Sequence, residues 1–263
     1  MINIFNYTIK EITKDEALKM VKEYHYSSTL PKINKHYLGF FLNDRIVGVV
    51  TLGLGTRPKH TIKKIFPNLD TKDYYEIGRM CMIDEMPKNS ESQMLSQLIK
   101  YIKENYKDIK VLFTWADGML NKPGYVYQAA NFLYAGYTTT DIYLYKGIKI
   151  HPRQTKKIFG LEHDPRVTVR PTLEQLNEYG IKHYKGMQIK YIFFLCDKTT
   201  KKKLMREATI PLTRDYLKGK DLKWKVKNEC GKWIITDNPP LYKTDTNLKD
   251  ECLKELFNEG SDK

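Results

Sequence analysis

The segment from residue 74 to residue 127 restricts the fold more than any other part of the chain. Residues 75–83 alternate apolar and mixed side chains over the length of a strand, and residues 84–89 break that pattern. Apolar residues then recur at helical intervals from Met94 to Ile102, and residues 110–116 form a second apolar run. A strand, a helix and a second strand predict a right-handed crossover between parallel strands.

The ends of these two strands are where a ligand is expected. Ligands of such sheets bind beyond the carboxyl ends of the parallel strands, so residues 79–88 and 117–127 should flank one crevice. Arg79 interrupts an apolar strand, and it either pairs with a carboxylate such as Glu76, faces solvent or meets a phosphate. Asp117 precedes Gly118, and it either forms an Asx turn or acts on a substrate or metal.

The remaining sequence supplies further strands and helices. Thr13 and Glu16 have capping-box spacing, which predicts a helix that ends near His25. The other expected elements are a first strand at 2–9, a hairpin of Tyr37–Leu42 and Arg45–Leu52 around Asn43-Asp44, a basic loop with one helical turn at 59–73, a short helix at 123–134, a hairpin at 138–149, a helical turn at 172–180, a strand at 189–195, a basic helix or turn at 198–206, a hairpin at 220–237 and a last helix at 247–258. Taken alone, this order predicts a mixed α/β domain.

Charge, cysteine content and the lack of long apolar runs limit the classes of protein to which the chain can belong. The chain has 263 residues, a formal net charge of +14 and four cysteines, Cys81, Cys196, Cys230 and Cys252, which we expect to be unpaired. Residues 146–206 hold 15 basic and 5 acidic residues, which favours a nucleic acid partner over a merely solvated surface. No apolar run approaches the roughly 18 residues of a membrane span and no signal peptide pattern is present, so we expect a cytoplasmic protein without a membrane partner.

Several motifs in this order resemble the Mom family of bacteriophage DNA adenine-modification proteins. They lie at residues 24–31, 89–92, 116–118, 126–134, 151–153 and 185–206. The resemblance covers roughly residues 15–210. It implies a GNAT-like acyltransferase fold, of the α/β class, with a central mixed, twisted sheet flanked by helices. It also implies transfer of a carbamoylmethyl group to the exocyclic amine of adenine in double-stranded DNA, which would protect phage DNA from restriction in the bacterial cytoplasm.

The resemblance also implies the active-site residues, which are His25, Tyr26, Arg79, Ser92, Asp117 and Tyr127. It suggests a metal requirement, and His25, Asp117 and Tyr127 offer nitrogen and oxygen ligands for iron. Considered alone, His25 can be a helix C-cap and Tyr127 a core residue.

The predicted helix start at residues 88–92 is a candidate cofactor site. A helix N-terminus suits a phosphate or an oxyanion, so Lys88, Asn89, Ser90 and Ser92 are candidate cofactor-binding residues. GNAT enzymes hold coenzyme A there with a glycine-rich loop, and this sequence has Pro87-Lys88-Asn89-Ser90 in its place. The donor could be acetyl-CoA or another acyl or glycyl donor. The competing prediction for Ser90 and Gln93 is a helix capping box.

DNA binding is assigned to the basic part of the chain. The candidate residues are His151, Arg153, Lys190, Lys201, Lys202, Lys203 and Arg206, and residues 151–153 can equally form an ordinary turn. A base-paired adenine amine is stacked in the duplex, so its modification calls for flipping of the nucleotide into a pocket.

The domain organisation predicted from these patterns is a catalytic domain at 1–210, with its DNA-binding portion at 146–206, and an extension at 211–263. The extension can be a subdomain, a dimer arm that contacts a second copy of the chain, or further DNA surface. Two other functions stay open: an N-acyltransferase acting on a protein, tRNA or small amine, and a DNA-binding protein without catalysis.

Overall fold

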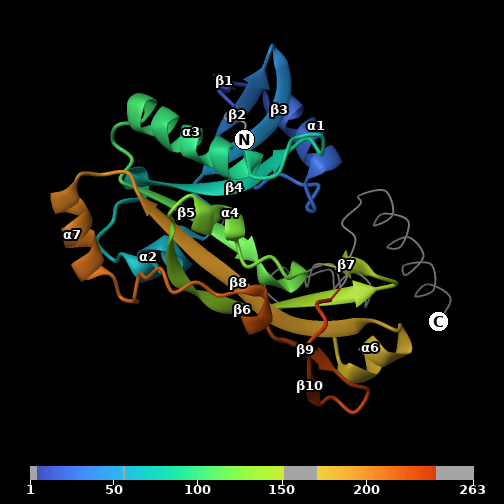
Figure 1. The fold of residues 1–263 in the computed structure, drawn as a ribbon. Coiled ribbons are helices and arrows are strands. Elements are labelled where there is room, and N and C mark those ends of the chain that lie inside the picture. Colours follow the sequence, from blue (N-terminus) through green and yellow to red (C-terminus); the bar gives the residue numbers. More distant parts are fainter. Residues whose placement is uncertain (1–4, 56, 151–170, 241–263) are drawn as a thin grey trace. The chain divides into compact units, whose positions relative to one another are not determined.

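The structure, a computed structural model, describes residues 5–55, 57–150 and 171–240. The chain forms two compact units (Figure 1). The first contains Met1–Ala116, Gly124–Tyr137 and Ile189–Tyr216, and the second contains Asp117–Pro123, Thr138–Gln188 and Leu217–Lys263. The predicted division into a catalytic domain at 1–210 and an extension at 211–263 stays a prediction.

The first unit carries the predicted crossover. Its strand order is β1-β2-β3-β4-β5-β8-β6. Strands β1 to β4 pair antiparallel in sequence order, and β4 pairs parallel with β5, which confirms the crossover through α3. The result is an α/β fold whose first part has the strand, helix, hairpin and crossover order predicted for a GNAT-like domain. Its elements are β1 (Thr8–Glu11), α1 (Lys14–Tyr24), β2 (Asn34–Leu42), β3 (Arg45–Gly53), η1 (Pro58–His60), α2 (Ile62–Ile65), η2 (Thr71–Asp73), β4 (Tyr74–Met82), α3 (Ser90–Asn105), β5 (Val111–Asp117), α4 (Tyr125–Ala129), α7 (Lys198–Glu207) and parts of β6 (Leu133–Tyr145) and β8 (Lys182–Phe194).

Helices cover both faces of this sheet. The Cys81 thiol of β4 lies 3.8 Å from the Met20 carbonyl of α1, so one face packs on α1. A Cβ placed on Gly48 of β3 would lie 2.7 Å from the Met94 sulfur, so the opposite face packs on α3. A buried cluster on the α1 face joins α2, β4, β5, β8 and α7 through apolar side chains, including Ile62, Phe66, Tyr74, Phe113, Ile192 and Leu204. These two layers make the crossover an ordinary buried βαβ unit.

Strand β4 contains a β-bulge at Gly78. Thr51 of β3 pairs with Arg79, whereas the next residue, Leu52, pairs with Ile77. Gly78 is therefore the extra residue, and the bulge inverts the facing of the residues that follow it. The parallel ladder with β5 runs from Tyr74 to Ile77, although β4 continues to Met82. The bulge thus marks the point where β4 and β5 stop pairing.

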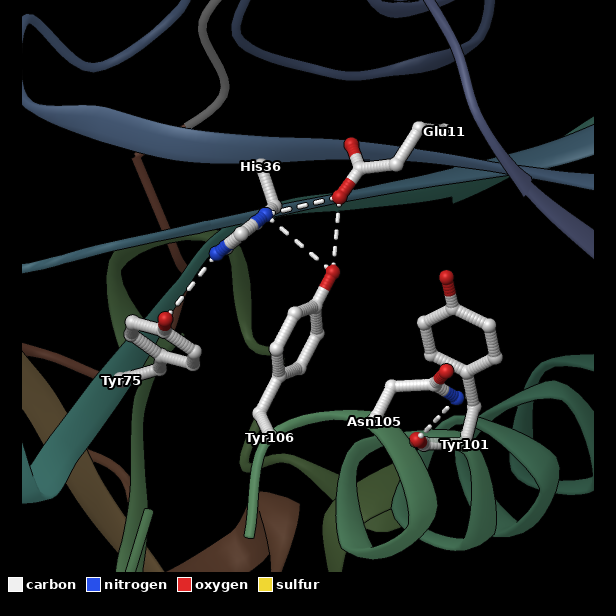
Figure 2. Close-up of polar contacts among 6 residues, drawn as sticks. All are labelled: Glu11, His36, Tyr75, Tyr101, Asn105 and Tyr106. Atoms are coloured by element: carbon white, nitrogen blue, oxygen red, sulfur yellow. Dashed lines mark hydrogen bonds and ion pairs between the residues drawn. The ribbon is translucent and has the colours of Figure 1, made fainter. Parts of the chain in front are cut away.

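A polar aromatic cluster ties the α3 face to β1 and β2 (Figure 2). Glu11 accepts from the Tyr106 hydroxyl at 2.7 Å and lies 2.7 Å from Nδ1 of His36. The other ring nitrogen of His36 lies 3.0 Å from the Tyr75 hydroxyl. Burial, and then the hydrogen bond to Glu11, raises the pKa of Tyr106, so its hydroxyl stays a donor. The cluster joins β1, β2, β4 and the end of α3.

The second unit is built around the remaining halves of β6 and β8. Its buried cluster contains Tyr143, Tyr145, Ile150, Leu176 and Ile181. Lys146 and Gly147 both have positive φ and form the tight turn of the predicted hairpin between β6 and β7. The further elements of this unit are η3 (Gly118–Leu120), β7 (Ile148–Ile150), α6 (Leu173–Glu178), η4 (Gly219–Asp221), β9 (Trp224–Lys227) and β10 (Trp233–Thr236).

Most predicted elements are confirmed, and four need correction. Within the described residues, the strand expected at 2–9 is Thr8–Glu11, and residues 2–4 lie outside them. The basic loop at 59–73 contains three short helical turns instead of one. The helix expected at 123–134 covers only Tyr125–Ala129, because Asn131 adopts a positive φ and residues from Leu133 join β6. Strand β8 begins at Lys182, well before the predicted residue 189.

Some predictions fall partly outside the described residues. His151, Arg153 and the helix expected at 247–258 lie there, as does Cys252. Cys81, Cys196 and Cys230 are free thiols, as expected. Within the described ranges, no helix combines the length and the hydropathy needed to cross a membrane.

Candidate active site

Glu76 and Arg79 of β4 form the most distinctive polar pair of the first unit. Residues three apart in a regular strand point to opposite faces, but the bulge at Gly78 brings both side chains to the α1 face. The Glu76 carboxylate packs against Gly55, whose backbone has a positive φ of 68°. Burial raises the pKa of Glu76 to about 7, while a hydrogen bond with Trp115 and the charge of Arg79 oppose the rise.

Arg79 holds the loop that follows α1. Its Nε donates to the Thr29 carbonyl at 2.8 Å, and Nη2 donates to the Ser27 hydroxyl at 3.1 Å. Nη1 donates to the Gly78 carbonyl at 2.7 Å. The structure therefore adds a fourth role to the three considered from the sequence, a clamp on backbone carbonyls. The planar guanidinium suits this role because it presents several donors in a fixed geometry.

His25 and Tyr26 lie in the clamped loop. His25 is the C-cap of α1, and its amide donates to the Val21 carbonyl at 3.1 Å. Nδ1 of His25 lies 2.9 Å from the Ser27 amide nitrogen and 3.1 Å from the Ser27 carbonyl oxygen, so the backbone of Ser27 positions the ring. The His25 and Tyr26 rings stack with centroids 4.3 Å apart. The structure thus brings His25, Tyr26 and Arg79 together on one side of the sheet.

Tyr127 lies on the other side of the sheet. It is buried on α4, and its ring contacts Phe132 and Tyr191 at centroid distances of 5.6 Å and 5.5 Å. Burial raises the pKa of its hydroxyl, and a hydrogen bond with Thr114 partly offsets the rise. Tyr127 is therefore both a core residue and a neutral phenol able to donate a proton.

The start of α3 is open to an anion. Asn89, the N-cap, has a positive φ of 73° and makes no side-chain capping bond. The predicted capping box is wrong, because the Ser90 hydroxyl donates to the Pro87 carbonyl and Gln93 accepts from the Phe5 amide. The Ser92 hydroxyl donates to the Asn89 carbonyl at 2.8 Å. First-turn amides without a side-chain cap suit a phosphate group, and Lys88 lies exposed beside them.

Asp117 ends β5 and begins the second unit. Its carboxylate accepts from the Met119 amide at 3.1 Å and caps η3, which is the Asx-turn alternative. Asp117 is 8% exposed, so the strand end carries a buried carboxylate. The crevice predicted between residues 79–88 and 117–127 draws on both units and stays a prediction.

The predicted iron ligands are not gathered within one unit. His25 and Tyr127 occupy opposite faces of the first unit's sheet, and Asp117 belongs to the second unit. Among the described residues, no group of three or more His, Cys, Asp or Glu side chains is arranged to hold a metal ion. The iron site expected at these three residues therefore stays a prediction.

The basic candidates on α7 have different surroundings. Lys202 and Arg206 are exposed and one helical turn apart, whereas Lys203 pairs with Glu207 at 3.9 Å and Lys201 lies over the Phe194 ring. Lys190 is half-buried, and burial, then Lys64, lowers its pKa. The exposed stripe of α7 is thus the clearest anion-binding feature among these residues.

Glu76 was missed as a site residue in the sequence. It stands in an alternating strand pattern, where a single polar residue usually faces solvent. The bulge brings Glu76 to the same side of the sheet as Arg79. The sequence contains one indication of this bulge, the glycine at position 78 within the strand.

The fold is similar to those of solved acetyltransferases. AAC(6')-Ib in complex with ribostamycin and coenzyme A matches with a TM-score of 0.40 and 14% identity, over 52% of this chain and 88% of that one. An N-acetyltransferase from Staphylococcus aureus Mu50 matches with a TM-score of 0.40 and 16% identity, over 73% of this chain and 100% of that one. A GNAT family acetyltransferase from Elizabethkingia anophelis with acetyl-CoA bound matches with a TM-score of 0.33 and 15% identity, over 72% of this chain and 98% of that one.

Sequence comparison gives the family. The methylcarbamoylase Mom of Escherichia phage Mu is 29% identical over 188 residues, which cover 72% of this chain and 75% of that protein. The model of the Mom protein family matches residues 6–212, well over half of the chain. The order of strands and helices described above lies largely within that match. The chain therefore belongs to the Mom protein family.

Proposed function

We propose that the chain is a DNA-modifying transferase that converts adenine in double-stranded DNA to N6-carbamoylmethyladenine. Membership of the Mom family and the methylcarbamoylase relative support this function. The observation that carries the proposal is that Glu76 and Arg79 lie on the same face of β4, on either side of the bulge, where β4 and β5 stop pairing. In a phage or prophage, such a product would hide adenine from restriction enzymes.

Glu76 is the proposed general base. An exocyclic amine loses a proton when it forms a bond to carbon, and a base with a pKa near the working pH accepts that proton most effectively. The pKa of Glu76, at about 7, meets this condition. The stacked His25 and Tyr26 rings, held through Arg79, offer an aromatic wall for a flipped base.

The donor is proposed to be acetyl-CoA or another acyl or glycyl donor, with its phosphate groups at the start of α3. The uncapped first-turn amides and Lys88 fit a pyrophosphate, with Asn89, Ser90 and Ser92 shaping the turn. A glycyl donor would supply every atom of the carbamoylmethyl group, although attack at its acyl carbon first gives the isomeric N6-glycyl adenine, which must rearrange; transfer from acetyl-CoA would give N6-acetyladenine instead. Tyr127 lies on the other face of the sheet from Glu76, so it could give a proton to the leaving group only if the donor passes between β4 and β5 beyond Ile77, where the two strands stop pairing. Asp117 remains a candidate for positioning the adenine amine.

The test is mass spectrometry of nucleosides from the DNA of a bacterial host that expresses the chain. The wild type should yield a deoxyadenosine heavier by a carbamoylmethyl group. Glu76→Gln should lower its yield at least about 100-fold, within the range that a general base supplies. Glu104→Gln, an exposed glutamate of α3, is the matched control and should leave the yield unchanged.

A second candidate is an N-acyltransferase that acts on a protein, tRNA or small amine. The GNAT-like order of β1 to α4 favours it. Unmodified DNA from well-folded protein, together with saturable binding of coenzyme A, would select this candidate over DNA modification.

A further inference from the structure

The second unit presents lysines and a tryptophan on one face of β8, β9 and β10. The register sets Lys185 opposite Lys225 and Lys227 opposite Trp233. Directly opposed residues share a face, as do residues two positions apart in one strand. Lys185, Lys225, Lys227, Trp233 and Ile235 therefore share one face, called here the lysine–tryptophan face.

The opposite face of the same strands is packed around Trp224, whereas Ile234, farther along that face, is 49% exposed. Trp224 is 2% exposed, and its indole N–H donates to the Gly118 carbonyl at 2.9 Å. A Cβ placed on Gly186 would lie 2.9 Å from the Trp224 ring and would also strike the Met119 sulfur. Ile235, on the lysine–tryptophan face, is 64% exposed. The packing around Trp224 helps to hold these strands together, and among the described residues Ile235 on the lysine–tryptophan face has no comparable cover.

The lysine–tryptophan face carries charge that its own described neighbours do not neutralise. Lys223 pairs with Asp237 at 2.7 Å, but Lys185, Lys225 and Lys227 form no ion pair with any residue in the described ranges. Lysines directly opposite each other repel across strands, as Lys185 and Lys225 do here. A bound anion would relieve that repulsion.

The groups beneath the face are a histidine and one carboxylate, against three lysines on the face itself. The buried His183 ring stacks on Tyr143 with centroids 4.4 Å apart and lies 3.4 Å from the Asp141 carboxylate. Burial lowers the pKa of His183 to about 4 despite Asp141, and Lys185 and Lys227 lower it further, so the ring is neutral near pH 7. Above it, the Lys185 Nζ lies 4.4 Å from the Trp233 ring centroid. The exposed chemistry is therefore cationic and aromatic.

We propose that the lysine–tryptophan face binds the phosphate backbone of duplex DNA, with Trp233 packed against the sugars or bases beside it. Lysines that neutralise phosphates and an aromatic face that packs on nucleotides are the combination nucleic acids bind. The proposal rests on the proposed function for its choice of polyanion. Strands β9 and β10 lie beyond residue 212, where the family match ends, so the face gives a role to the extension of this chain.

The test compares two triple variants of the full chain in binding a fluorescein-labelled 20-base-pair duplex across a salt series. Lys→Gln at 185, 225 and 227 should weaken binding at least about tenfold. It should also make the slope of log affinity against log salt shallower by about 0.9 for each phosphate contact that the substitutions remove. Lys→Gln at 14, 19 and 100, three exposed helical lysines, is the control with the same change in net charge. Wild-type affinity and slope in the first variant, or an equal loss of affinity in the control, would overturn the proposal.

Two further measurements separate the possible causes of failure. Trp233→Ala should weaken duplex binding more than Trp233→Phe, with the unfolding midpoint of each variant measured beside it. A loss of binding that merely follows a loss of folded protein counts against the proposal. Nucleoside mass spectrometry reports on modification independently. A wild type that modifies DNA while the first triple variant binds normally refutes the lysine–tryptophan face alone, and a wild type that binds DNA without modifying it refutes only the transferase.

Discussion

Single residues of β4 decide most of the candidate chemistry, and Glu76 makes the first prediction. Its pKa is about 7 in the folded chain and lower when unfolded, so the folded state holds the extra proton between those values. Stability should therefore fall as pH rises from about 4.5 to about 7. Glu76→Gln should remove this decline. Above pH 8 its unfolding free energy should exceed that of the wild type by up to about 3 kcal/mol, and near pH 4 the two should differ little. Denaturant titrations at the two pH values measure it.

The same carboxyl makes an opposite prediction for activity. A general base acts only when deprotonated, so the modification rate should rise through about pH 7 while stability falls. A single-turnover rate measured from pH 5.5 to pH 8.5 reports the apparent pKa. A rate independent of pH over this range would remove Glu76 from the base role.

Arg79 tests whether the loop after α1 is held for function. Lysine cannot reproduce three donors in one plane, so Arg79→Lys should release Thr29 and Ser27 while keeping the charge. We expect modification to fall at least about tenfold and trypsin to cut faster at Lys32, in the clamped loop. Arg45→Lys, in an exposed ion pair with Glu85, is the control and should change neither. An unchanged cleavage rate in Arg79→Lys would show that the clamp is dispensable.

At the scale of elements, the cluster of Figure 2 fastens the end of α3 to β1. Tyr106→Phe deletes the hydroxyl that donates to Glu11 and should cost about 1–2 kcal/mol of unfolding free energy, as loss of a hydrogen bond to a charged group does. Tyr101→Phe, on the last turns of the same helix, is the matched variant and should cost less. Chemical denaturation compares them, and equal losses would mean that the Glu11 bond adds nothing.

Helix α7 separates basic residues that the sequence groups together. Lys202 and Arg206 lie exposed on one stripe, whereas Lys203 pairs with Glu207. Replacing Lys202 and Arg206 with Gln should flatten the salt dependence of DNA binding, by about 0.9 in slope for each phosphate that is no longer neutralised. Replacing Lys203 and Lys198 with Gln changes the net charge equally on the same helix. A larger effect from this second pair would move the DNA-binding stripe to another side of α7.

The whole molecule carries a formal net charge of +14, and this should dominate its first encounter with DNA. With 6–10 phosphate contacts, affinity for a duplex should fall about 10³–10⁵-fold between 50 and 200 mM salt. Fluorescence anisotropy at several salt concentrations measures the slope. A flat salt dependence would leave the DNA-binding hypothesis without its electrostatic basis and would favour a small or neutral acceptor.

Local sequence determined those elements whose cause is local. Thr13 and Glu16 form the predicted capping box, and Asn43-Asp44 forms the predicted turn with φ positive at both residues. The crossover through α3 was also predictable, because strand and helix periodicities depend only on neighbouring residues. The family motifs added the candidate site residues, which no spacing rule could supply.

The tertiary structure alone decided how these residues meet. Periodicity places Glu76 and Arg79 on opposite faces, and only the pairing of β4 with β3 creates the bulge that unites them. Ser90 and Gln93 bond to Pro87 and Phe5 instead of capping the helix, and Phe5 lies 88 positions from Gln93 in the chain. Strand β8 lies between β5 and β6 in the sheet, and Tyr184 and Lys185 in its first half also pair with β9. Such choices follow from long-range pairing and burial, whereas the sequence by itself reports only the preferences of neighbours.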